Sequence, residues 1–396
     1  LLVGLGRWVS RTKKGHTKTA EDYFLASKAL PWCAIGSSLI AANISAEQFI
    51  GMSGSGFAGG LAIASYEFMA ALTLIIVGKF FLPIFIKQGI YTIPEFVEKR
   101  FSTNLKTILA VFWIALFVFV NLTSVLFLGG KAIDTIVGVG DGSMIVPAII
   151  ALAIFAAAYS LYGGLSAVAW TDVIQVALLV IGGIITTLIA LHYVTPDGGI
   201  LNGISHIADA ASDKFDMVLS RDNKEFNNLP GIYVLIGGLW VANLYYWGFN
   251  QYIIQRTLAA KSLTEAQRGI AFAAFLKMLI PFIVVIPGIV AWVMYSEDLY
   301  GARSAFEIAG STALNNDNAY PWLISTFIPV GVKGLVLAAL AAAIVSSLAS
   351  MLNSTSTIFT MDIYKPYINR EASQTKLVNV GRLTAGIALI IAVCLA

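Results

Sequence analysis

Polar residues and glycines interrupt the first long apolar run of the chain, in the stretch NISAEQFIGMSGSGFAGG at positions 43–60. Asn43, Glu47 and Gln48 can donate or accept hydrogen bonds, and five glycines follow them. Inside a bilayer each unpaired backbone group costs several kcal/mol, so a broken helix persists only where it lines a cavity within protein. Such a break at membrane depth is typical of the binding site of a transporter.

Ionisable residues within the other apolar runs are rare, and each is a candidate for function. Glu67 and Lys277 each stand alone in a long run without other charges, and Asp172 follows the turn sequence YGGLSAVAWT. Glu67 and Lys277 could instead form a structural pair. Asp172 could cap a helix N-terminus, where the helix dipole favours an acid. For Glu47 we favour a role in satisfying backbone groups that the helix break sets free.

Asn243, Tyr246 and Trp247 share one helix face because they are spaced by three and four residues. An aromatic face flanked by amide and carboxylate groups suits a sugar, whose C–H face packs on the ring while its hydroxyls form directional hydrogen bonds. Ordinary helix packing is the alternative interpretation of the two rings. The position of the three residues, in the helix that opens the second half of the chain, favours contact with a ligand.

Ala343, Ser346 and Ser347 share a helix face in the same way. Two neighbouring hydroxyls that face a broken helix form an oxygen site for a hard monovalent cation, to which unwound backbone carbonyls supply the other ligands. Small residues also let helices approach closely in membranes. The spacing alone favours neither interpretation.

The composition is that of a membrane protein. The 396 residues are 58% hydrophobic and 12% charged, against roughly 25% charged residues in soluble domains. Cys33 and Cys394 show no disulfide or metal-site pattern. The glycines of GSGFAG at 54–59 match a dinucleotide-binding motif but follow no expected strand. The sequence shows no catalytic triad, phosphate-binding loop or metal site, so we expect no enzyme activity, no organic cofactor and no nucleic-acid partner.

Apolar runs long enough to span a bilayer recur along the chain. We expect nine spans, at 30–53, 58–86, 106–134, 143–163, 170–193, 229–255, 269–295, 331–362 and 377–396. The loops between them alternate between basic and acidic, which places the basic loops in the cytoplasm. Two of the basic loops are expected to contain Lys87, Lys99, Arg100 and Lys106, and Arg256, Lys261 and Arg268.

The acidic outer loop divides five expected helices from four, and each half opens with a polar-interrupted helix. The expected organisation is a flanking helix end and basic segment at 1–29, a first repeat at 30–193, the loop at 194–228 and a second repeat at 229–396. Because five is odd, the two halves have opposite topology and form an inverted repeat. The chain begins and ends within apolar runs, so we interpret it as truncated at both ends, before a tenth core helix.

Five long motifs, spread over essentially the whole chain, resemble those of the sodium/solute symporter family. They are AANISAEQFIGMSGSG, ASYEFM, YGGLSAVAWTDVIQ, GLWVANLYYWGFNQYIIQRTLAAKS and AAAIVSSLASMLNSTSTIFTMDIY. The resemblance implies an all-α polytopic membrane protein with a five-plus-five inverted repeat of the leucine-transporter type. It also implies sodium-coupled symport of a monosaccharide, galactose or glucose, by alternating access across the bacterial cytoplasmic (inner) membrane.

The resemblance also implies roles for single residues. Those expected to bind the sugar are Gln48, Glu67, Asn243, Tyr246, Trp247 and Lys277. Those expected to form gates are Met52 and Tyr66 on the outside and Tyr246 on the inside. Those expected to bind sodium are the backbone carbonyls of Ala41, Ile44 and Ala343 and the hydroxyls of Ser346 and Ser347. Asn43 is expected to support the sodium site, and Asp172 to lie on the sodium exit route.

One residue departs from the pattern that the resemblance implies. Ala70, directly after ASYEFM, stands where a sugar-transporting relative has a serine, so one hydrogen bond to the substrate is expected to be lost. Proline and inositol are alternative cargoes for the same fold, and a sensor that does not transport is a second alternative. Glu67 in the expected pocket argues against an anionic cargo.

Overall fold

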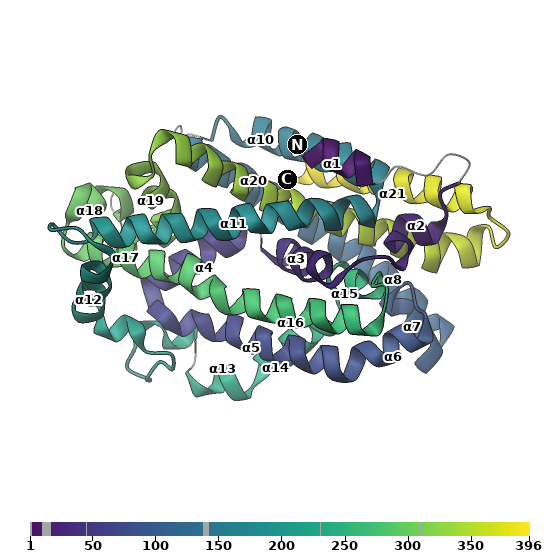
Figure 1. Cartoon of the computed structure of the whole chain (residues 1–396), viewed down its shortest axis with the longest axis horizontal. Coiled ribbons are helices and arrows are strands. Elements are labelled where there is room, and N and C mark those ends of the chain that lie inside the picture. The colour runs from purple at the N-terminus through teal and green to yellow at the C-terminus, as the bar shows by residue number, and fades with distance from the viewer. Residues whose placement is uncertain are drawn as a thin grey trace.

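The computed structural model describes residues 2–9, 17–44, 46–137, 142–229, 231–308, 311 and 313–396. In these residues the regular structure is helical, and the only strand-like contacts are two isolated bridges, Leu30–Ala260 and Glu307–Leu314. Most of the long helices run along the long axis of the molecule (Figure 1). Helices satisfy their own backbone hydrogen bonds, so this architecture suits a chain that is mostly apolar.

The helices of the first half lie between residues 2 and 210. Their bounds are α1 Leu2–Val9, α2 Ala20–Phe24, α3 Trp32–Asn43, α4 Ala46–Gly59, α5 Ala64–Ile76, α6 Leu82–Gln88, α7 Ile93–Arg100, α8 Thr103–Ala115, α9 Thr123–Val137, α10 Ile145–Gly163, α11 Leu165–Tyr193 and α12 Ile200–Ala210. Wider π turns join α5 to α6, at Val77–Phe81, and α8 to α9, at Leu116–Leu122.

The helices of the second half follow a long loop. Their bounds are α13 Ile232–Ile236, α14 Gly238–Leu244, α15 Gln251–Leu258, α16 Leu263–Ile280, α17 Ile286–Ser296, α18 Ala302–Phe306, α19 Ala319–Phe327, α20 Val330–Ile358 and α21 Gln374–Leu395. Further π turns follow α14, α16 and α20, at Tyr245–Phe249, Pro281–Val285 and Phe359–Ile368.

Seven apolar helical stretches of the described residues are long enough to cross a membrane. They are Gln48–Gln88, Thr103–Asp134, Ile145–Gly163, Leu165–Tyr193, Leu263–Ser296, Val330–Ile368 and Gln374–Leu395. An eighth exists if Lys224–Ile236 and Gly238–Phe249, which meet at 74°, form one bent span. The run expected at 30–53 is not one continuous helix, because it is divided between α3, of 12 residues, and α4.

Two helices in the described part of the chain are broken where the sequence predicts polar interruptions. After α3, Ile44 is extended, with φ −80° and ψ 113°. Before α15, Asn250 is extended, with φ −77° and ψ 122°. The side chain of Asn250 accepts a hydrogen bond from the backbone N–H of Tyr252 at 3.2 Å. It therefore caps α15 and satisfies one of the donors that the break exposes.

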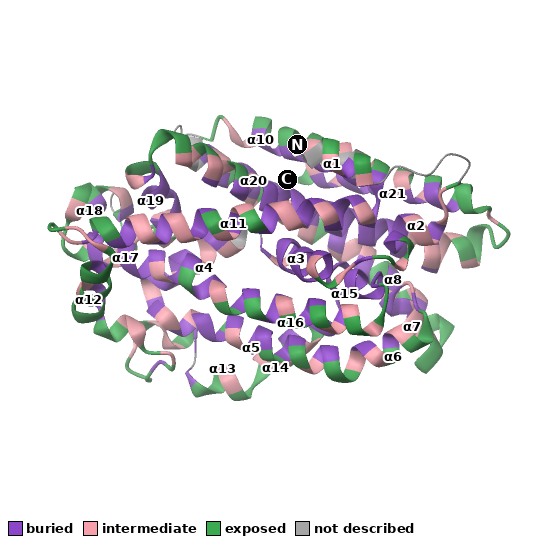
Figure 2. Ribbon diagram, viewed as in Figure 1, coloured by how far each residue is buried: buried purple, intermediate pink, exposed green. Residues whose placement is uncertain are grey.

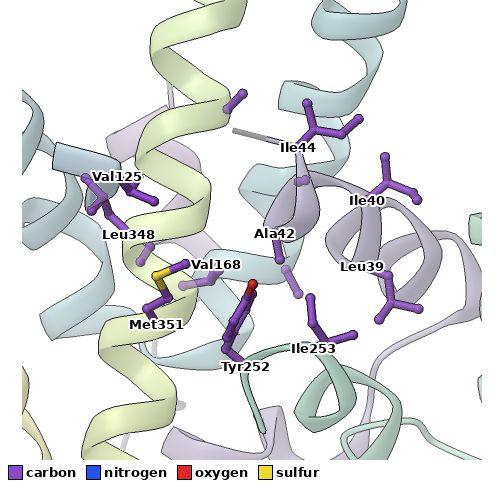
Figure 3. Packing of buried hydrophobic residues seen from close by; sticks show 14 of the residues in the cluster. Leu39, Ile40, Ala42, Ile44, Val125, Val168, Tyr252, Ile253, Leu348 and Met351 are labelled. Carbon is purple, nitrogen blue, oxygen red and sulfur yellow. The ribbon is translucent and has the colours of Figure 1, made fainter. Parts of the chain in front are cut away.

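Helix α3 lies at the centre of the molecule and is almost wholly buried (Figure 2). It packs against α11, α15, α16 and α20. Near its end, Ala42 and Ile44 lie among Val168 of α11, Tyr252 of α15 and Leu348 of α20 (Figure 3). The first break is therefore enclosed by protein, as a non-helical backbone within a membrane requires.

The outer half of the first broken helix, α4, is fixed by close backbone contacts. A Cβ atom on Gly288 of α17 would lie 2.1 Å from the carbonyl oxygen of Ser53, so only glycine lets these two helices approach so closely. At the turn after α4, Gly60 has a φ of +73°. A Cβ atom there would lie 2.2 Å from the carbonyl oxygen of Lys214 in the long outer loop.

The basic loops gather at the end of the molecule that carries α2, α7 and the start of α21, on the right in Figure 1. Two residues assigned to those loops are instead buried. Arg256 lies within α15 and is 1% exposed. Lys106 lies in the first turn of α8, where its ammonium lies 2.6 Å from Glu98 and 3.7 Å from Asp362. The loop assignment was wrong for both. At the end of an apolar run, the sequence does not distinguish a cation that faces water from one that faces a buried acceptor.

Candidate functional site

Two polar side chains converge on Glu67, in the first turn of α5. Gln48 of α4 donates from Nε2 to Oε1 of Glu67 at 2.7 Å, and Lys277 of α16 donates from Nζ to Oε2 at 2.6 Å. The ammonium of Lys277 also lies 5.3 Å from the ring centre of Trp247. Glu67 is 3% exposed and Lys277 is 1% exposed, so each charge depends on the other to offset the loss of hydration. The structural pair that the sequence left open therefore exists, and Gln48 and Trp247 adjoin it.

Tyr246 lies between the two broken helices. Its hydroxyl accepts a hydrogen bond from Nδ2 of Asn43 at 3.0 Å and lies 2.8 Å from the hydroxyl of Tyr252. Because Asn43 ends α3 and Tyr252 is in the first turn of α15, these contacts connect the two breaks. Asn243 is buried but does not join the group, since its Nδ2 donates to the carbonyl oxygen of Leu239 in its own helix at 3.0 Å.

The two residues expected at the outer gate differ in exposure. The sulfur of Met52 lies 3.5 Å from Nε2 of Gln48, which places Met52 beside the Glu67 cluster. Tyr66 is 37% exposed and lines a cleft of about 300 Å³ together with residues of the outer loop, such as Glu225. Tyr66 immediately precedes Glu67 in α5, but Glu67 is buried and is not among the residues that line the cleft.

Three of the expected sodium ligands, Ala41, Ile44 and Ser347, lie at the first break. The hydroxyl of Ser347 donates to the carbonyl oxygen of Ala42 at 3.1 Å and lies 3.5 Å from that of Ile44. Ala41 and Ala343, whose carbonyls are also expected ligands, are each 1% exposed. Backbone carbonyls and a hydroxyl, without a carboxylate, form a donor set that suits a hard monovalent cation.

Ser346 points instead toward Asp172. Its hydroxyl donates to one carboxylate oxygen of Asp172 at 2.5 Å, and the hydroxyl of Ser38, from α3, donates to the other. Asp172 is completely buried, in the second turn of α11. The carboxylate of Asp172 accepts hydrogen bonds from side chains of α3 and α20 and therefore links helices. It lies too far into α11 to cap that helix.

Arg256 is central to this group, although sequence reasoning placed it in a loop. Its Nε donates to Ser38 at 2.7 Å, and its two terminal nitrogens contact the hydroxyl of Ser350 and the carbonyl oxygen of Tyr252. A buried guanidinium needs several acceptors in place of water, and its planar donors suit such a set. The sequence signal that could have revealed it is its short distance from the break at Asn250, which keeps the side chain at membrane depth.

Two further sequence predictions concern the same region. The side chain of Glu47 lies outside the described part of the chain, as does the role suggested for it. Ala70 is 4% exposed and follows Glu67 by about one helical turn, so a methyl group faces the same side of α5 as the carboxylate. Among the described residues no group of three or more His, Cys, Asp or Glu side chains could hold a metal ion.

Comparisons with known proteins identify relatives of this chain. The model of the sodium:solute symporter family matches residues 23–396. The sodium/glucose cotransporter of Vibrio parahaemolyticus is 65% identical over 399 residues, which cover 100% of this chain and 72% of that protein. The human sodium/myo-inositol cotransporter is 33% identical over 405 residues, which cover 96% of this chain and 55% of that protein. The chain thus spans about half the length of the myo-inositol cotransporters that it matches.

A solved structure supports the same family. It is the substrate-bound, outward-open state of a Na⁺-coupled sialic acid symporter, with a TM-score of 0.83 and 26% sequence identity. The match covers 100% of this chain and 79% of that one. It confirms the all-helical inverted-repeat fold of the leucine-transporter type, and with the relatives it identifies a multi-pass membrane transporter rather than an enzyme. The chain belongs to the sodium:solute symporter family.

Proposed function

We propose that this chain carries a monosaccharide, galactose or glucose, together with sodium across the bacterial cytoplasmic membrane into the cell. The observation that carries the proposal is the buried group of Gln48, Glu67 and Lys277 beside Trp247. It offers acceptors, donors and an aromatic ring within one site, which is what a neutral polyhydroxylated ring requires. The 65% identity to the Vibrio sodium/glucose cotransporter supports the choice of cargo.

The sugar site comprises residues from four helical segments. The residues proposed to contact sugar are Gln48, Glu67, Asn243, Tyr246, Trp247 and Lys277. Glu67 and Lys277 are already paired, so sugar hydroxyls add to a preformed polar group and neither charge needs to be left alone during binding. Asn243 has to exchange its bond to Leu239 for one to the sugar.

Sodium bridges the first broken helix and α20. The proposed ligands are the backbone carbonyls of Ala41, Ile44 and Ala343 and the hydroxyls of Ser346 and Ser347. To bind the ion, Ser346 releases its hydrogen bond to Asp172. The carboxylate of Asp172 then has a free oxygen beside the ion, which makes it the next ligand on the proposed exit route to the cytoplasm.

The gates act in sequence during alternating access. Met52 and Tyr66 close over the sugar from outside, and the sodium bridge fixes the position of α3 against α20 while they do so. On the inside, Tyr246 has to leave its partners Asn43 and Tyr252 before the sugar can pass. Asn43 therefore connects the sodium-binding break to the inner gate.

The sodium gradient supplies enough free energy for accumulation of sugar. One charge that crosses about 100 mV yields roughly 2.3 kcal/mol. A tenfold sodium gradient adds about 1.4 kcal/mol. At one-to-one coupling the sum of about 3.7 kcal/mol supports a roughly 500-fold gradient of sugar.

Uptake into proteoliposomes tests the proposal. The purified protein is reconstituted, and labelled galactose and glucose are supplied with an inward gradient of sodium or, as the control, of potassium. We expect concentrative uptake with sodium only, and competition by an excess of unlabelled sugar. Glu67→Ala and Asn243→Ala should weaken sugar binding. Equal uptake in both gradients, or uptake of neither sugar by folded protein, would refute the proposal.

A second cargo is favoured by specific observations. Several relatives at 33–34% identity are sodium/myo-inositol cotransporters, and Ala70 places a methyl group beside Glu67. Myo-inositol has a ring of hydroxyls without the ring oxygen of a hexose, so the same polar group could bind it. Competition of labelled galactose uptake by unlabelled myo-inositol, glucose and proline ranks these cargoes in one experiment.

A further inference from the structure

Two positive side chains converge on one carbonyl oxygen at the end of α10, where an apolar span of the molecule ends. The ammonium of Lys18 lies 3.3 Å from the carbonyl oxygen of Tyr162 and 3.0 Å from that of Gly163. Arg382 of α21 donates to the same oxygen of Tyr162 at 3.3 Å. Both cations also lie over the rings of Tyr23 and Tyr162, between 5.5 and 5.8 Å from the ring centres. Separate parts of the chain thus bring two positive charges to one helix end.

The protein does not neutralise this pair of charges. A helix C-terminus carries roughly half a negative charge, which is less than the two positive charges that meet it here. Within the described part of the chain, neither Lys18 nor Arg382 forms an ion pair with a carboxylate. The carboxylate of Asp22, in α2, accepts hydrogen bonds from Thr19 and Ser27 instead. An excess of positive charge is therefore left at one point of the surface.

The repulsion between the two cations is reflected in the pKa of Lys18. Burial, and then the charge of Arg382, lower this pKa from 10.5 to about 8, and the charge of Asp22 opposes them with a smaller effect. The Nε atom of Arg382 is buried and has no hydrogen-bond partner among the residues that the structure describes. A bound anion would favour the charged form of both side chains and remove the repulsion.

Exposed apolar side chains of α21 extend from this pair of cations along the span. Leu383, Ile387 and Ile390 share one face of the helix, because they are spaced by four and three residues, and all three are exposed. Tyr162 is exposed as well, on α10, which packs against α21. An excess of positive charge at the end of a span, with an apolar face beside it, matches the anionic head group and the acyl chain of one phospholipid.

We propose that Lys18 and Arg382 bind the phosphate of an anionic membrane phospholipid, whose acyl chain lies along the exposed face of α21. The planar donors of Arg382 suit phosphate oxygens, and the ammonium of Lys18 adds a second charge. Phosphatidylglycerol has the required net negative charge. Phosphatidylcholine does not, because its head group carries a cation that balances the phosphate. The site involves none of the proposed sugar and sodium ligands, so it does not depend on the cargo.

Lipid binding to the purified protein tests the proposal. Native mass spectrometry in a neutral detergent counts the lipids bound per chain over a series of concentrations of phosphatidylglycerol or of phosphatidylcholine with the same acyl chains. We expect the first phosphatidylglycerol to bind roughly tenfold more tightly than phosphatidylcholine. The double variant Lys18→Gln/Arg382→Gln should lose this preference. The matched control is Arg370→Gln/Lys376→Gln, which removes the same two charges from exposed residues at the start of α21 and just before it and should keep the preference.

A second measurement does not require removal of either cation. As the pH rises above 8, Lys18 loses its proton, so the affinity of the wild type for phosphatidylglycerol should fall. Lys18→Arg stays charged in that range and should keep its affinity. An equal fall in both proteins would show that Lys18 is not a ligand and would overturn the proposal.

Three other results would also overturn the lipid site. The first is a wild type that binds both lipids equally. The second is an equal loss of preference in the control variant, since the effect would then be a general attraction of anions to the basic end of the molecule. The third is displacement of phosphatidylglycerol by an equal concentration of inorganic phosphate, which would identify a site for a free anion. None of these results bears on sugar uptake, so the proposed function is tested separately.

Discussion

The ion pair between Glu67 and Lys277 allows a test at the scale of single residues that separates folding from sugar binding. Removing one partner leaves a buried charge unpaired, at a cost of about 3–5 kcal/mol. We expect Glu67→Gln and Lys277→Met each to lower the unfolding temperature, and the double variant to recover most of the loss. Thermal unfolding of the purified proteins measures this effect, and galactose binding should be lost in all three. A double variant less stable than both single ones would contradict the pairing.

Arg256 is also a buried charge that depends on partners within the protein, but its partners are hydroxyl and carbonyl groups. Arg256→Met removes the donor to Ser38, which itself donates to the buried Asp172, and the donor to Ser350. We expect it to destabilise by more than Ser350→Ala, which deletes two hydrogen bonds, one accepted from Arg256 and one donated to the carbonyl oxygen of Ser346, each worth about 1 kcal/mol. Arg256→Lys should restore little, because an ammonium cannot reproduce the planar fork. Thermal unfolding of the three variants gives the order, and equal losses in all of them would argue against a central role for the guanidinium.

At the scale of elements, two cations meet the C-terminus of α10. The ammonium of Lys18 lies 3.0 Å from the carbonyl oxygen of Gly163, and Arg382 donates to that of Tyr162 at 3.3 Å. Burial, and then the charge of Arg382, lower the pKa of Lys18 from 10.5 to about 8. Lys18 is half-buried and lies outside the membrane-spanning stretches, so water can reach its ammonium.

The lowered pKa of Lys18 predicts a pH dependence of stability. Between pH 8 and 10.5 the folded protein binds fewer protons than the unfolded chain, so its stability rises with pH across that window. Below pH 8 both states are protonated and the destabilisation is fully present. We expect the unfolding temperature to increase from pH 8 toward pH 10, and Lys18→Gln to flatten the increase. An unchanged slope in Lys18→Gln would show that other groups control it.

The sequence predicted elements better than contacts. The apolar runs of the sequence locate α10, α11 and α21, because each is a long helix whose apolar composition alone indicates that it crosses a membrane. The two breaks were also predictable, since polar residues at membrane depth need a partner within the protein. The hydrogen-bond partners were not predictable, because they come from distant parts of the chain. Arg256, for example, contacts Ser350, which is 94 positions away in the sequence. The roles of the expected sugar and sodium ligands stay predictions.

At the scale of the whole molecule, the start of α7 joins α15 to the segment after α20. Gln251, at the start of α15, accepts from the backbone N–H of Ile93 at 2.8 Å and donates to the carbonyl oxygen of Tyr91 at 3.1 Å. Thr92, the cap of α7, donates to Asp362 beyond α20 at 3.0 Å. The start of α7 is thus bonded both to the second broken helix and to the end of α20. A change between outward and inward states that moves α15 against α20 has to break one of these contacts.

The proposed sodium site takes its ligands from two helices, α3 and α20, which leads to a last prediction. Ser347 supplies the hydroxyl of α20 that already reaches the carbonyls of Ala42 and Ile44. The variant Ser347→Ala keeps the carbonyl ligands but loses the hydroxyl with which α20 contributes to the proposed sodium site. We expect the sodium concentration for half-maximal sugar uptake to rise at least tenfold, about 1.4 kcal/mol, while the maximal rate at saturating sodium stays close to that of the wild type. Sugar uptake into proteoliposomes at a series of sodium concentrations measures both quantities.

The matched control for this prediction is Ser356→Ala on the same helix. The hydroxyl of Ser356 donates to the carbonyl oxygen of Asn353, within α20, at 2.9 Å, so its loss removes a buried hydroxyl without touching the break. If the bridge couples the two helices, Ser347→Ala should need more sodium while Ser356→Ala should not. An equal shift in both variants would mean that the effect comes from the stability of α20. A fall in the maximal rate without a shift in sodium dependence would mean that Ser347 affects the conformational change and not sodium binding. The sodium site would then have to lie elsewhere.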